Sequence, residues 1–315
     1  MHFADDVARR RNLDRNWTRS VLGQALYLPS VAQLMLPQPG GTKNWRVYRR
    51  RFVEPMRIRA GVRFWLRNRA TLRRAEAEFG VPPEIIVGIV GVETIYGQQM
   101  GYQRVIDALA TLAFDFPSAH PRAATRQAFF RDELEQFLAL CQRTGMDPES
   151  LGSYAGAMGM PQFMPSSWAH YAIDYDGDNQ IDLWNSEADV IGSVANYFKE
   201  HGWQPGLPAR YDVRLSPRAN MGVLLAPDIE PTFSPARFAA LGAQLDADGL
   251  AHPGLLALVE LQNGNPALHG DPPTWVAGTA NFRAITRYNQ SAYYAMAVLD
   301  LGAAVASAVY RATAP

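Results

Sequence analysis

Apolar residues recur at helical spacing along most of the chain, so the pattern predicts a mainly helical protein. Val62, Trp65 and Leu72 fall on one side of a helix that has arginines between them. Gly80 and the prolines that follow it end this helix and begin the next. The same periodicity predicts further helices over 83–96, 105–114, 122–143, 188–201 and 291–312.

The texture changes between residues 205 and 283, where proline and glycine are frequent. Short apolar runs in this segment predict the strands of a small β module, at 211–215, 223–225, 255–261 and 274–276. The expected fold class is therefore mainly α, of the α+β kind. We expect three domains, which are a helical N-terminal domain over 1–80 that packs with a C-terminal helix in 286–315, a core domain over 81–204, and the β module over 205–285.

The composition describes a folded chain without a global charge. Hydrophobic residues make up 48% and charged residues 19% of the 315 residues, which argues against disorder. Thirty basic residues balance thirty acidic ones, so net charge does not point to nucleic acid or membrane. The segment 43–74 departs from this balance, with twelve Lys or Arg against the single acid Glu54. This basic segment is interpreted either as helix faces exposed to solvent or as a surface that attracts an anionic polymer. No nucleic-acid motif accompanies it.

Few other classes of chemistry have support in the sequence. The single cysteine, Cys141, lies in an apolar run and is interpreted as a core residue, not a nucleophile. No stretch approaches the roughly 20 apolar residues of a transmembrane helix. The N-terminus shows neither an apolar leader nor a lipid-attachment cysteine, so we expect a cytoplasmic protein or one whose export signal is absent from this chain. HExxH, GxGxxG, P-loop, CxxC and GxSxG patterns are all absent from the sequence.

One carboxylate stands out because its surroundings are apolar. Glu93 is the only ionisable carboxylate within 85–97, a segment whose helix should be buried on most faces. Burial without a charged partner raises the pKa of a carboxyl group, which keeps it protonated near neutral pH and suits a general acid. The alternative is a structural Glu that is paired to an arginine. The glycines at 88, 91 and 97 favour the catalytic reading, because they cost helix propensity yet allow chain or ligand to approach.

The region around Glu93 resembles the membrane-bound lytic murein transglycosylase B family. The resembling segments occur in the family's order and span nearly the whole chain, namely 81–97, 106–112, 156–167 (GAMGMPQFMPSS), 191–198 and 285–289. The resemblance implies a lysozyme-like helical core and assigns the catalytic role to Glu93. It implies a lyase, in which one Glu first acts as acid and then as base while the 6-hydroxyl of the muramic acid attacks. The sequence itself also indicates a single catalytic carboxylate, because the next acids after Glu93 are Asp107 and Asp115, fourteen or more residues away.

The resemblance also assigns substrate contacts. The small, uncharged loop from 153 to 162 can lie against a sugar ring, although without the resemblance its methionines would be interpreted as core filler. The resemblance also assigns four tyrosines from other segments, which can stack on sugar faces, although each taken singly is more often a core residue. A substrate-binding arginine, Arg122 or Arg126, is left unplaced. The assigned contacts are Ser153, Met158, Gln162, Tyr48, Tyr197, Tyr288, Asn289 and Tyr294.

An acidic loop follows, from 174 to 182. Oxygen-bearing side chains at its positions 1, 3, 5 and 9 match the front half of an EF-hand calcium loop. Asn179 replaces the usual glycine and Asn185 replaces the closing Glu. The resemblance implies a later closing ligand, so the expected structural Ca²⁺ site consists of Asp174, Asp176, Asp178, the Gln180 backbone carbonyl and Asp189. The alternative is an acidic surface turn without metal.

The function expected from the sequence is cleavage of peptidoglycan glycan strands to 1,6-anhydromuropeptides, without a catalytic cofactor. A hydrolytic muramidase and a catalytically silent peptidoglycan-binding protein remain as alternatives. The expected location is the periplasm, with an outer-membrane association through an N-terminal signal that is absent from this chain. We expect a monomer that binds no nucleic acid.

Overall fold

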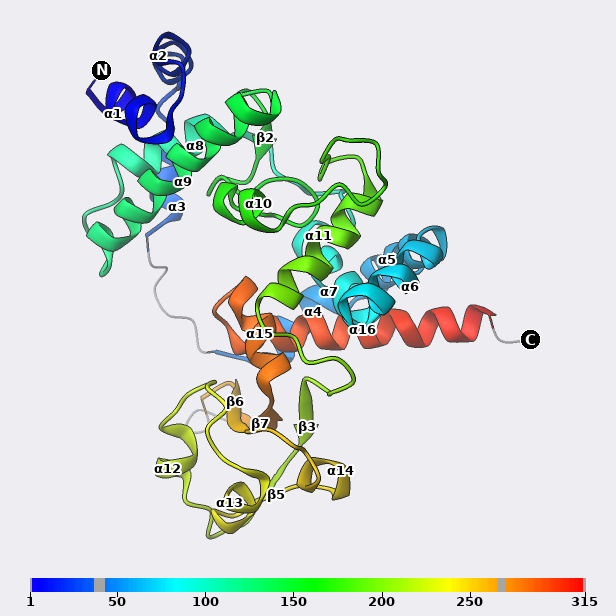
Figure 1. Ribbon diagram of the computed structural model, residues 1–315. Helices are drawn as coiled ribbons and strands as arrows, with labels where there is room; N and C mark the ends of the chain where they lie inside the picture. The colour runs from blue at the N-terminus through cyan, green and yellow to red at the C-terminus, as the bar shows by residue number, and fades with distance from the viewer. Residues whose placement is uncertain (1, 37–42, 266–269, 314–315) are drawn as a thin grey trace. The chain divides into compact units, whose positions relative to one another are not determined.

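The computed structural model describes residues 2–36, 43–265 and 270–313 (Figure 1). Two compact units share the chain, and each consists of two segments. Unit 1 comprises Met1–Gly40 and Glu93–Ser193, whereas unit 2 comprises Gly41–Val92 and Val194–Pro315. The division falls inside helices α7 (Pro83–Thr94) and α11 (Glu187–Glu200). These two units do not test the three domains expected from the sequence, at 1–80, 81–204 and 205–285, which stay a prediction.

The described residues of unit 1 form helices and one two-stranded sheet. Its centre is the packing of α8 on α9, and every residue of α8 except Phe114 is buried. Strands β1 and β2 pair antiparallel, with Gln103 opposite Gly152. Its elements are α1 (His2–Arg11), α2 (Arg15–Gly23), α3 (Pro29–Leu34), β1 (Gln103–Arg104), α8 (Val105–Phe114), α9 (Ala123–Thr144), β2 (Leu151–Gly152) and α10 (Pro165–Tyr171).

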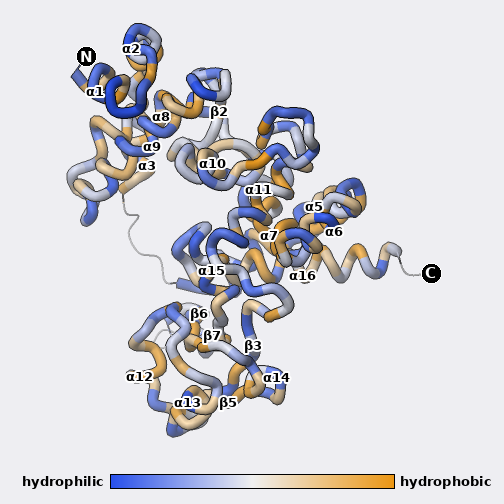
Figure 2. Tube along the Cα trace, in the orientation of Figure 1, coloured by the Kyte–Doolittle hydropathy of each residue, from blue (hydrophilic) through white to orange (hydrophobic). Residues whose placement is uncertain are grey.

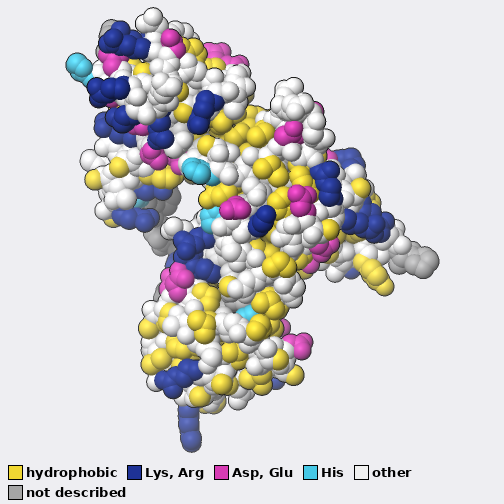
Figure 3. All heavy atoms as spheres, in the orientation of Figure 1, with side chains coloured by type: hydrophobic (Ala, Val, Ile, Leu, Met, Phe, Trp, Pro, Cys, Tyr) yellow, Lys and Arg dark blue, Asp and Glu magenta, His cyan; other side chains and the backbone are white. Residues whose placement is uncertain are grey.

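Ion pairs connect the N-terminal helices of unit 1 to each other and to α9. The carboxylate of Asp5 accepts hydrogen bonds from Arg15 and Arg19 of α2. Arg10 and Arg11 of α1 pair with Glu135, which lies on α9. Basic and acidic side chains accordingly lie intermixed around α1 and α2 (Figure 3). These charges hold the first helices against the buried core of the unit.

Unit 2 combines helices with a small β module. Its three-stranded antiparallel sheet has the order β3-β7-β6, and a second sheet pairs β4 with β5. The strands are β3 (Arg210–Asp212), β4 (Arg214–Leu215), β5 (Ala243–Gln244), β6 (Ala257–Asn263) and β7 (Asp271–Gly278). The helices are α4 (Trp45–Phe52), α5 (Pro55–Arg67), α6 (Arg69–Phe79), α12 (Met221–Leu225), α13 (Pro235–Ala240), α14 (Ala247–Leu250), α15 (Ala280–Tyr288) and α16 (Ala292–Thr313).

Three of the four expected strand regions are confirmed, and one is wrong. The runs at 211–215, 255–261 and 274–276 overlap β3 with β4, β6 and β7. The run at 223–225 instead lies in the short helix α12, because the Asn220 side chain caps it by accepting a hydrogen bond from the Val223 amide. Leu224 of this helix is fully buried in the hydrophobic core of the β module. One buried residue within such a short run does not distinguish a strand from a helical turn.

The C-terminal helix α16 is long and apolar, as its colouring in Figure 2 shows. Within the described residues it is one helix with the length and composition to cross a membrane, so the expectation that no such stretch exists is wrong. Half of its most apolar window is nevertheless buried inside the structure, and α16 packs on α4, α5, α15 and β6. Those contacts are typical of a core helix. Glycines allow α16 and α7 to approach, because a Cβ at Gly88 would overlap Val298 and one at Gly302 would overlap Glu84.

Candidate active site

Glu93 lies in the last turn of α7, on a helix that is otherwise almost entirely buried. Residues from Ile85 to Val92 are buried, whereas Glu93 itself is partly exposed. The helix is as apolar and as buried as the sequence predicted, and Glu93 is the partly exposed residue in its last turn. The end of the helix also receives a cation, because the Arg57 guanidinium donates a hydrogen bond from Nε to the Gly91 carbonyl at 2.8 Å.

The chain leaves α7 through an uncommon backbone conformation. Ile95, Tyr96 and Gly97 follow one another with φ of 51°, 56° and 86°. A left-handed conformation is strained for a β-branched residue such as Ile95. The expected helix over 83–96 therefore ends two residues earlier, at Thr94. Tertiary contacts override the helical periodicity at this point.

Thr94 fixes this conformation. Its buried hydroxyl donates to the Met160 carbonyl at 2.8 Å and accepts from the Gly97 amide at 3.0 Å. The Met160 amide in turn donates to the Leu183 carbonyl at 2.8 Å. The residue after Glu93 is thus tied directly to the loop that the resemblance assigns to substrate. Sequence reasoning missed Thr94, because a threonine near a helix end carries no distinctive signal.

The loop from 153 to 162 is folded by its own hydrogen bonds. The Ser153 hydroxyl accepts from the Ala155 and Ala157 amides at 3.2 and 3.0 Å. The Gln162 side chain donates to the Met100 carbonyl at 3.2 Å and to the Gly159 carbonyl at 2.9 Å. Met158 is fully buried, and its amide and carbonyl pair with the carbonyl and amide of Phe163 at 2.9 and 3.1 Å. The structure therefore gathers Ser153, Met158 and Gln162 in one loop.

Three further carboxylates of unit 1, two of them buried, have hydrogen-bond partners. Asp107 accepts from the Leu26 amide at 2.8 Å and pairs with Arg104. Glu133 accepts from the amide and hydroxyl of Ser166 at 2.9 and 2.6 Å, although burial raises the pKa of Glu133. The exposed Asp115 accepts from the Tyr27 hydroxyl at 2.5 Å. These interactions hold elements of unit 1 together.

Three of the assigned tyrosines come together in unit 2. The rings of Tyr197 and Tyr288 lie 4.8 Å apart between centroids, and those of Tyr288 and Tyr294 are stacked at 6.4 Å. Tyr197 and Tyr294 are buried, whereas Tyr288 is partly exposed and Asn289 is exposed. Tyr288 thus offers the accessible ring of this group.

Tyr48 belongs to a different aromatic group, which we name the α4 aromatic cluster. It consists of Trp45, Tyr48, Phe52 and Tyr293, with the Tyr48 and Tyr293 rings edge to face at 5.8 Å. Trp45 and Tyr293 had not been singled out from the sequence. The sequence did contain a signal for Tyr293, because it directly precedes the assigned Tyr294 in one helix. Tyr293 belongs to the α4 aromatic cluster, and Tyr294 belongs to the group around Tyr288.

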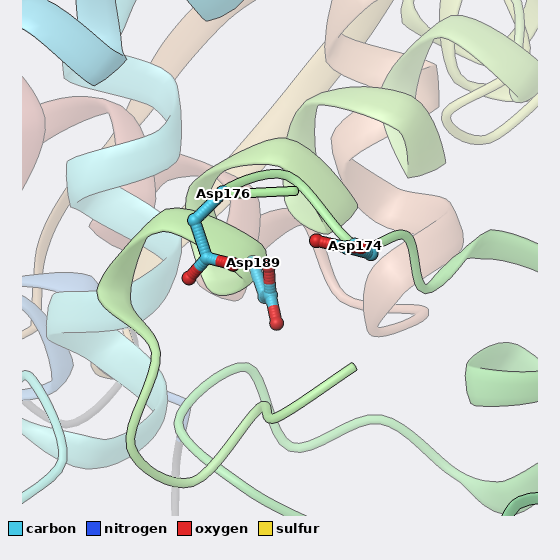
Figure 4. A group of neighbouring side chains, drawn as sticks. All are labelled: Asp174, Asp176 and Asp189. Carbon is cyan, nitrogen blue, oxygen red and sulfur yellow. The ribbon is translucent and has the colours of Figure 1, made fainter. Parts of the chain in front are cut away.

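The acidic loop of unit 1 brings three carboxylates together. One oxygen from each of Asp174, Asp176 and Asp189 lies within 4.8 Å of the other two (Figure 4). Asn179 has the left-handed φ of 69° that its place in a calcium loop requires. Asp178 is not part of this group, and its carboxylate accepts from the Gln180 amide at 2.8 Å. Three hard carboxylate oxygens at this spacing fit a calcium ion.

Asp189 is the buried member of the group. Its two oxygens accept from the Tyr175 and Asp182 amides at 2.7 and 2.8 Å, so the side chain joins both ends of the loop to α11. Burial raises the pKa of Asp189, the backbone donors oppose this, and the nearby Asp176 adds to it. A cation in the group would favour the ionised carboxylates.

Comparisons with known proteins decide the family. The chain matches the transglycosylase SLT domain family over residues 1–303. It is 41% identical to membrane-bound lytic murein transglycosylase B of Escherichia coli (strain K12), over 97% of this chain and 82% of that protein. The chain belongs to this family. It is a lytic transglycosylase, as the sequence predicted.

Solved structures agree with this assignment. The Escherichia coli lytic transglycosylase Slt35 in complex with calcium superposes with a TM-score of 0.82 and 40% identity, over 98% of this chain and 92% of that one. SltB3 from Pseudomonas aeruginosa, in complex with NAG-anhNAM-pentapeptide, gives a TM-score of 0.77 and 28% identity, over 96% and 78%. The mainly helical, lysozyme-like fold expected from the sequence is confirmed.

Proposed function

We propose that this transglycosylase cleaves the β-1,4 bond between N-acetylmuramic acid and N-acetylglucosamine in peptidoglycan, with Glu93 as its acid and base. The observation that carries the assignment is the place of Glu93, a partly exposed carboxylate at the end of a buried apolar helix. The SltB3 complex, whose ligand contains an anhydro sugar, supports a non-hydrolytic product.

The reaction requires only one carboxyl group. Glu93 gives its proton to the glycosidic oxygen as the bond from that oxygen to C1 of the muramic acid breaks. The 6-hydroxyl of the same sugar then bonds to C1 and loses its proton to the Glu93 carboxylate, which restores the acid. Because the attacking oxygen is part of the substrate, its effective molarity is high and no activated water is needed.

The substrate contacts follow from the family resemblance and from chemistry. We assign the accessible ring of Tyr288 and the neighbouring Asn289 to sugar binding, with Tyr197 and Tyr294 supporting that ring. Ser153 and Gln162 would present a preformed loop, whose fold the fully buried Met158 would support. Tyr48 would act from the separate α4 aromatic cluster.

Replacement of Glu93 tests the catalytic assignment. Glu93→Gln keeps the size of the side chain but cannot supply or accept the proton, so turnover of purified sacculi should fall by about 10²–10⁴-fold while binding is retained. Gln98→Glu is a matched control, because it changes charge on an exposed residue just beyond α7. Equal digestion by Glu93→Gln and by the parent enzyme would refute the role.

Product mass separates the two enzymatic alternatives. Mass spectrometry of the digest should show muropeptides that end in an anhydro sugar. A hydrolytic muramidase would instead yield products heavier by one water, with a reducing end. A catalytically silent binding protein would retain sacculi without releasing either product.

We also propose that the acidic loop binds a structural Ca²⁺ through Asp174, Asp176 and Asp189. Asp178 and the Gln180 carbonyl complete the ligand set expected from the sequence. The calcium complex of Slt35 and the spacing of the three carboxylates support this proposal. The ion would brace the loop against α11 and takes no part in catalysis.

We place the protein in the periplasm as a monomer, associated with the outer membrane.

A further inference from the structure

Unit 2 contains a cavity of about 540 Å³ whose lining carries charges of both signs. Asp228 and Glu260 provide carboxylates, and Lys43 and Arg51 provide cations. A smaller hollow of about 230 Å³ shares Lys43, Asp228 and Glu260 with it. The family assignment and the proposed calcium site leave these four charged side chains without a role.

The four side chains differ from other charged residues nearby, because none of them forms a hydrogen bond or ion pair within the described part of the chain. Two other arginines of α4 do have partners, since Arg46 pairs with Asp271 and Arg49 with Asp300. The cavity is therefore lined by carboxylates and cations that do not form ion pairs with one another. Such an arrangement suits a ligand that carries both charges itself.

One wall of the cavity is aromatic and rigid. Tyr48 and Tyr293 of the α4 aromatic cluster line it. The Tyr293 hydroxyl accepts a hydrogen bond from the Gln262 amide at 2.8 Å, which attaches the ring to the edge of β6. Asp228 reaches the cavity from a left-handed backbone position with φ of 55°, a conformation that aspartate tolerates better than most residues.

We propose that this cavity binds the stem peptide of peptidoglycan at an amino acid whose free end carries an ammonium and a carboxylate on one carbon, as in diaminopimelate. Asp228 and Glu260 would receive the ammonium, and Lys43 or Arg51 the carboxylate. The inference rests on the proposed function. Its position is consistent with that function, because the cavity-lining Gln290 and Ser291 follow the proposed sugar contact Asn289 directly in the chain.

Calorimetry with three ligands tests the proposal on the active enzyme. The ligands are N-acetylglucosaminyl-anhydromuramic acid without peptide, with a tripeptide ending in diaminopimelate, and with the same tripeptide ending in lysine. None of them contains the bond that the proposed reaction breaks. The parent should bind the diaminopimelate ligand about tenfold more tightly than the lysine ligand, which lacks the second carboxylate.

Charge-removing variants then assign the two ends of the ligand. The double variant Lys43→Met/Arg51→Met should abolish the preference for diaminopimelate over lysine. Asp228→Asn/Glu260→Gln should weaken both peptide ligands about tenfold and leave the peptide-free ligand unchanged. Asp248→Asn removes a charge from an exposed position of unit 2 outside the cavity and should change none of the affinities.

Two results would overturn the proposal. One is a parent enzyme that binds the peptide-free ligand as tightly as the diaminopimelate ligand. The other is an equal loss for all three ligands in Asp228→Asn/Glu260→Gln. Failure of the proposed function shows separately, as undiminished sacculus digestion by Glu93→Gln, and it leaves these binding measurements interpretable.

Discussion

The two regions that we assign to substrate are held in place by different means. In unit 1 the chain after Glu93 and the loop from 153 to 162 are fixed by backbone hydrogen bonds and by glycines that allow close approach. In unit 2 the assigned residues are aromatic rings that pack on one another and charged side chains without partners. A region fixed through its backbone tolerates few substitutions, whereas one built from side chains can change its ligand while the fold persists.

The largest effect on stability is expected at a glycine of unit 1 whose backbone packs directly on another backbone segment. Gly101 has φ of 91°, and a Cβ there would overlap the Gly152 carbonyl. Gly101→Ala should therefore lower the free energy of unfolding by about 3 kcal/mol, which urea denaturation measures. Gly145→Ala is the matched control, with φ of 76° and no neighbouring atom within 4 Å of an added Cβ. It should cost only about 1 kcal/mol. Similar losses at the two glycines would show that conformation, not contact, governs this region.

The proposed calcium ion would provide unit 1 with a third means of fixing a loop. Chelation should lower the melting temperature, because an ion present at about 100 times its Kd stabilises the folded state by about 2.7 kcal/mol. Asp176→Asn should lose most of this dependence, since it removes one exposed ligand charge while leaving the buried Asp189 in place. A melting temperature that does not respond to chelator or to added Ca²⁺ would leave the acidic loop as a surface turn without metal.

The hydroxyl of Thr94 offers a finer test of the loop behind Glu93. Thr94→Val keeps the shape of the side chain but leaves the Met160 carbonyl and the Gly97 amide without their partner. The expected loss is about 1–3 kcal/mol of stability. If the hydroxyl positions Glu93, kcat should fall more than KM rises. Thr94→Ser should restore both quantities, and a variant that loses stability with unchanged kcat would limit Thr94 to a structural role.

The elements of the fold could be predicted wherever apolar periodicity was long. The helix expected over 105–114 is α8 residue for residue, because ten largely apolar positions leave no alternative register. Short segments were less certain, since packing of Leu224 and capping by Asn220 turned an apolar run into helix α12. The end of α7 was also missed, because Ile95 is left-handed and Thr94 bonds to the Met160 carbonyl, more than sixty positions away.

The candidate site shows the same limit. Local spacing placed Asp174 and Asp176 at one cluster, and the resemblance added the distant Asp189. Spacing also implied Asp178, which lies outside this group of three and accepts from the Gln180 amide, so its role as a ligand stays a prediction. The charged cavity lay beyond prediction, because Lys43, Asp228 and Glu260 come from three separate segments that only the folded chain brings together.

The smallest expected effect belongs to the aromatic wall of unit 2. Tyr293→Phe removes the hydroxyl that accepts from the Gln262 amide but keeps the ring and its contacts with Tyr48. Because Gln262 is exposed, water can replace the lost partner, and the loss should stay near 1 kcal/mol in urea denaturation. Tyr293→Leu, which also removes the ring, should cost clearly more. If the two variants were equally destabilised, the hydrogen bond of the hydroxyl rather than ring packing would stabilise the aromatic wall. Unit 2 would then not differ from unit 1 in how this region is held.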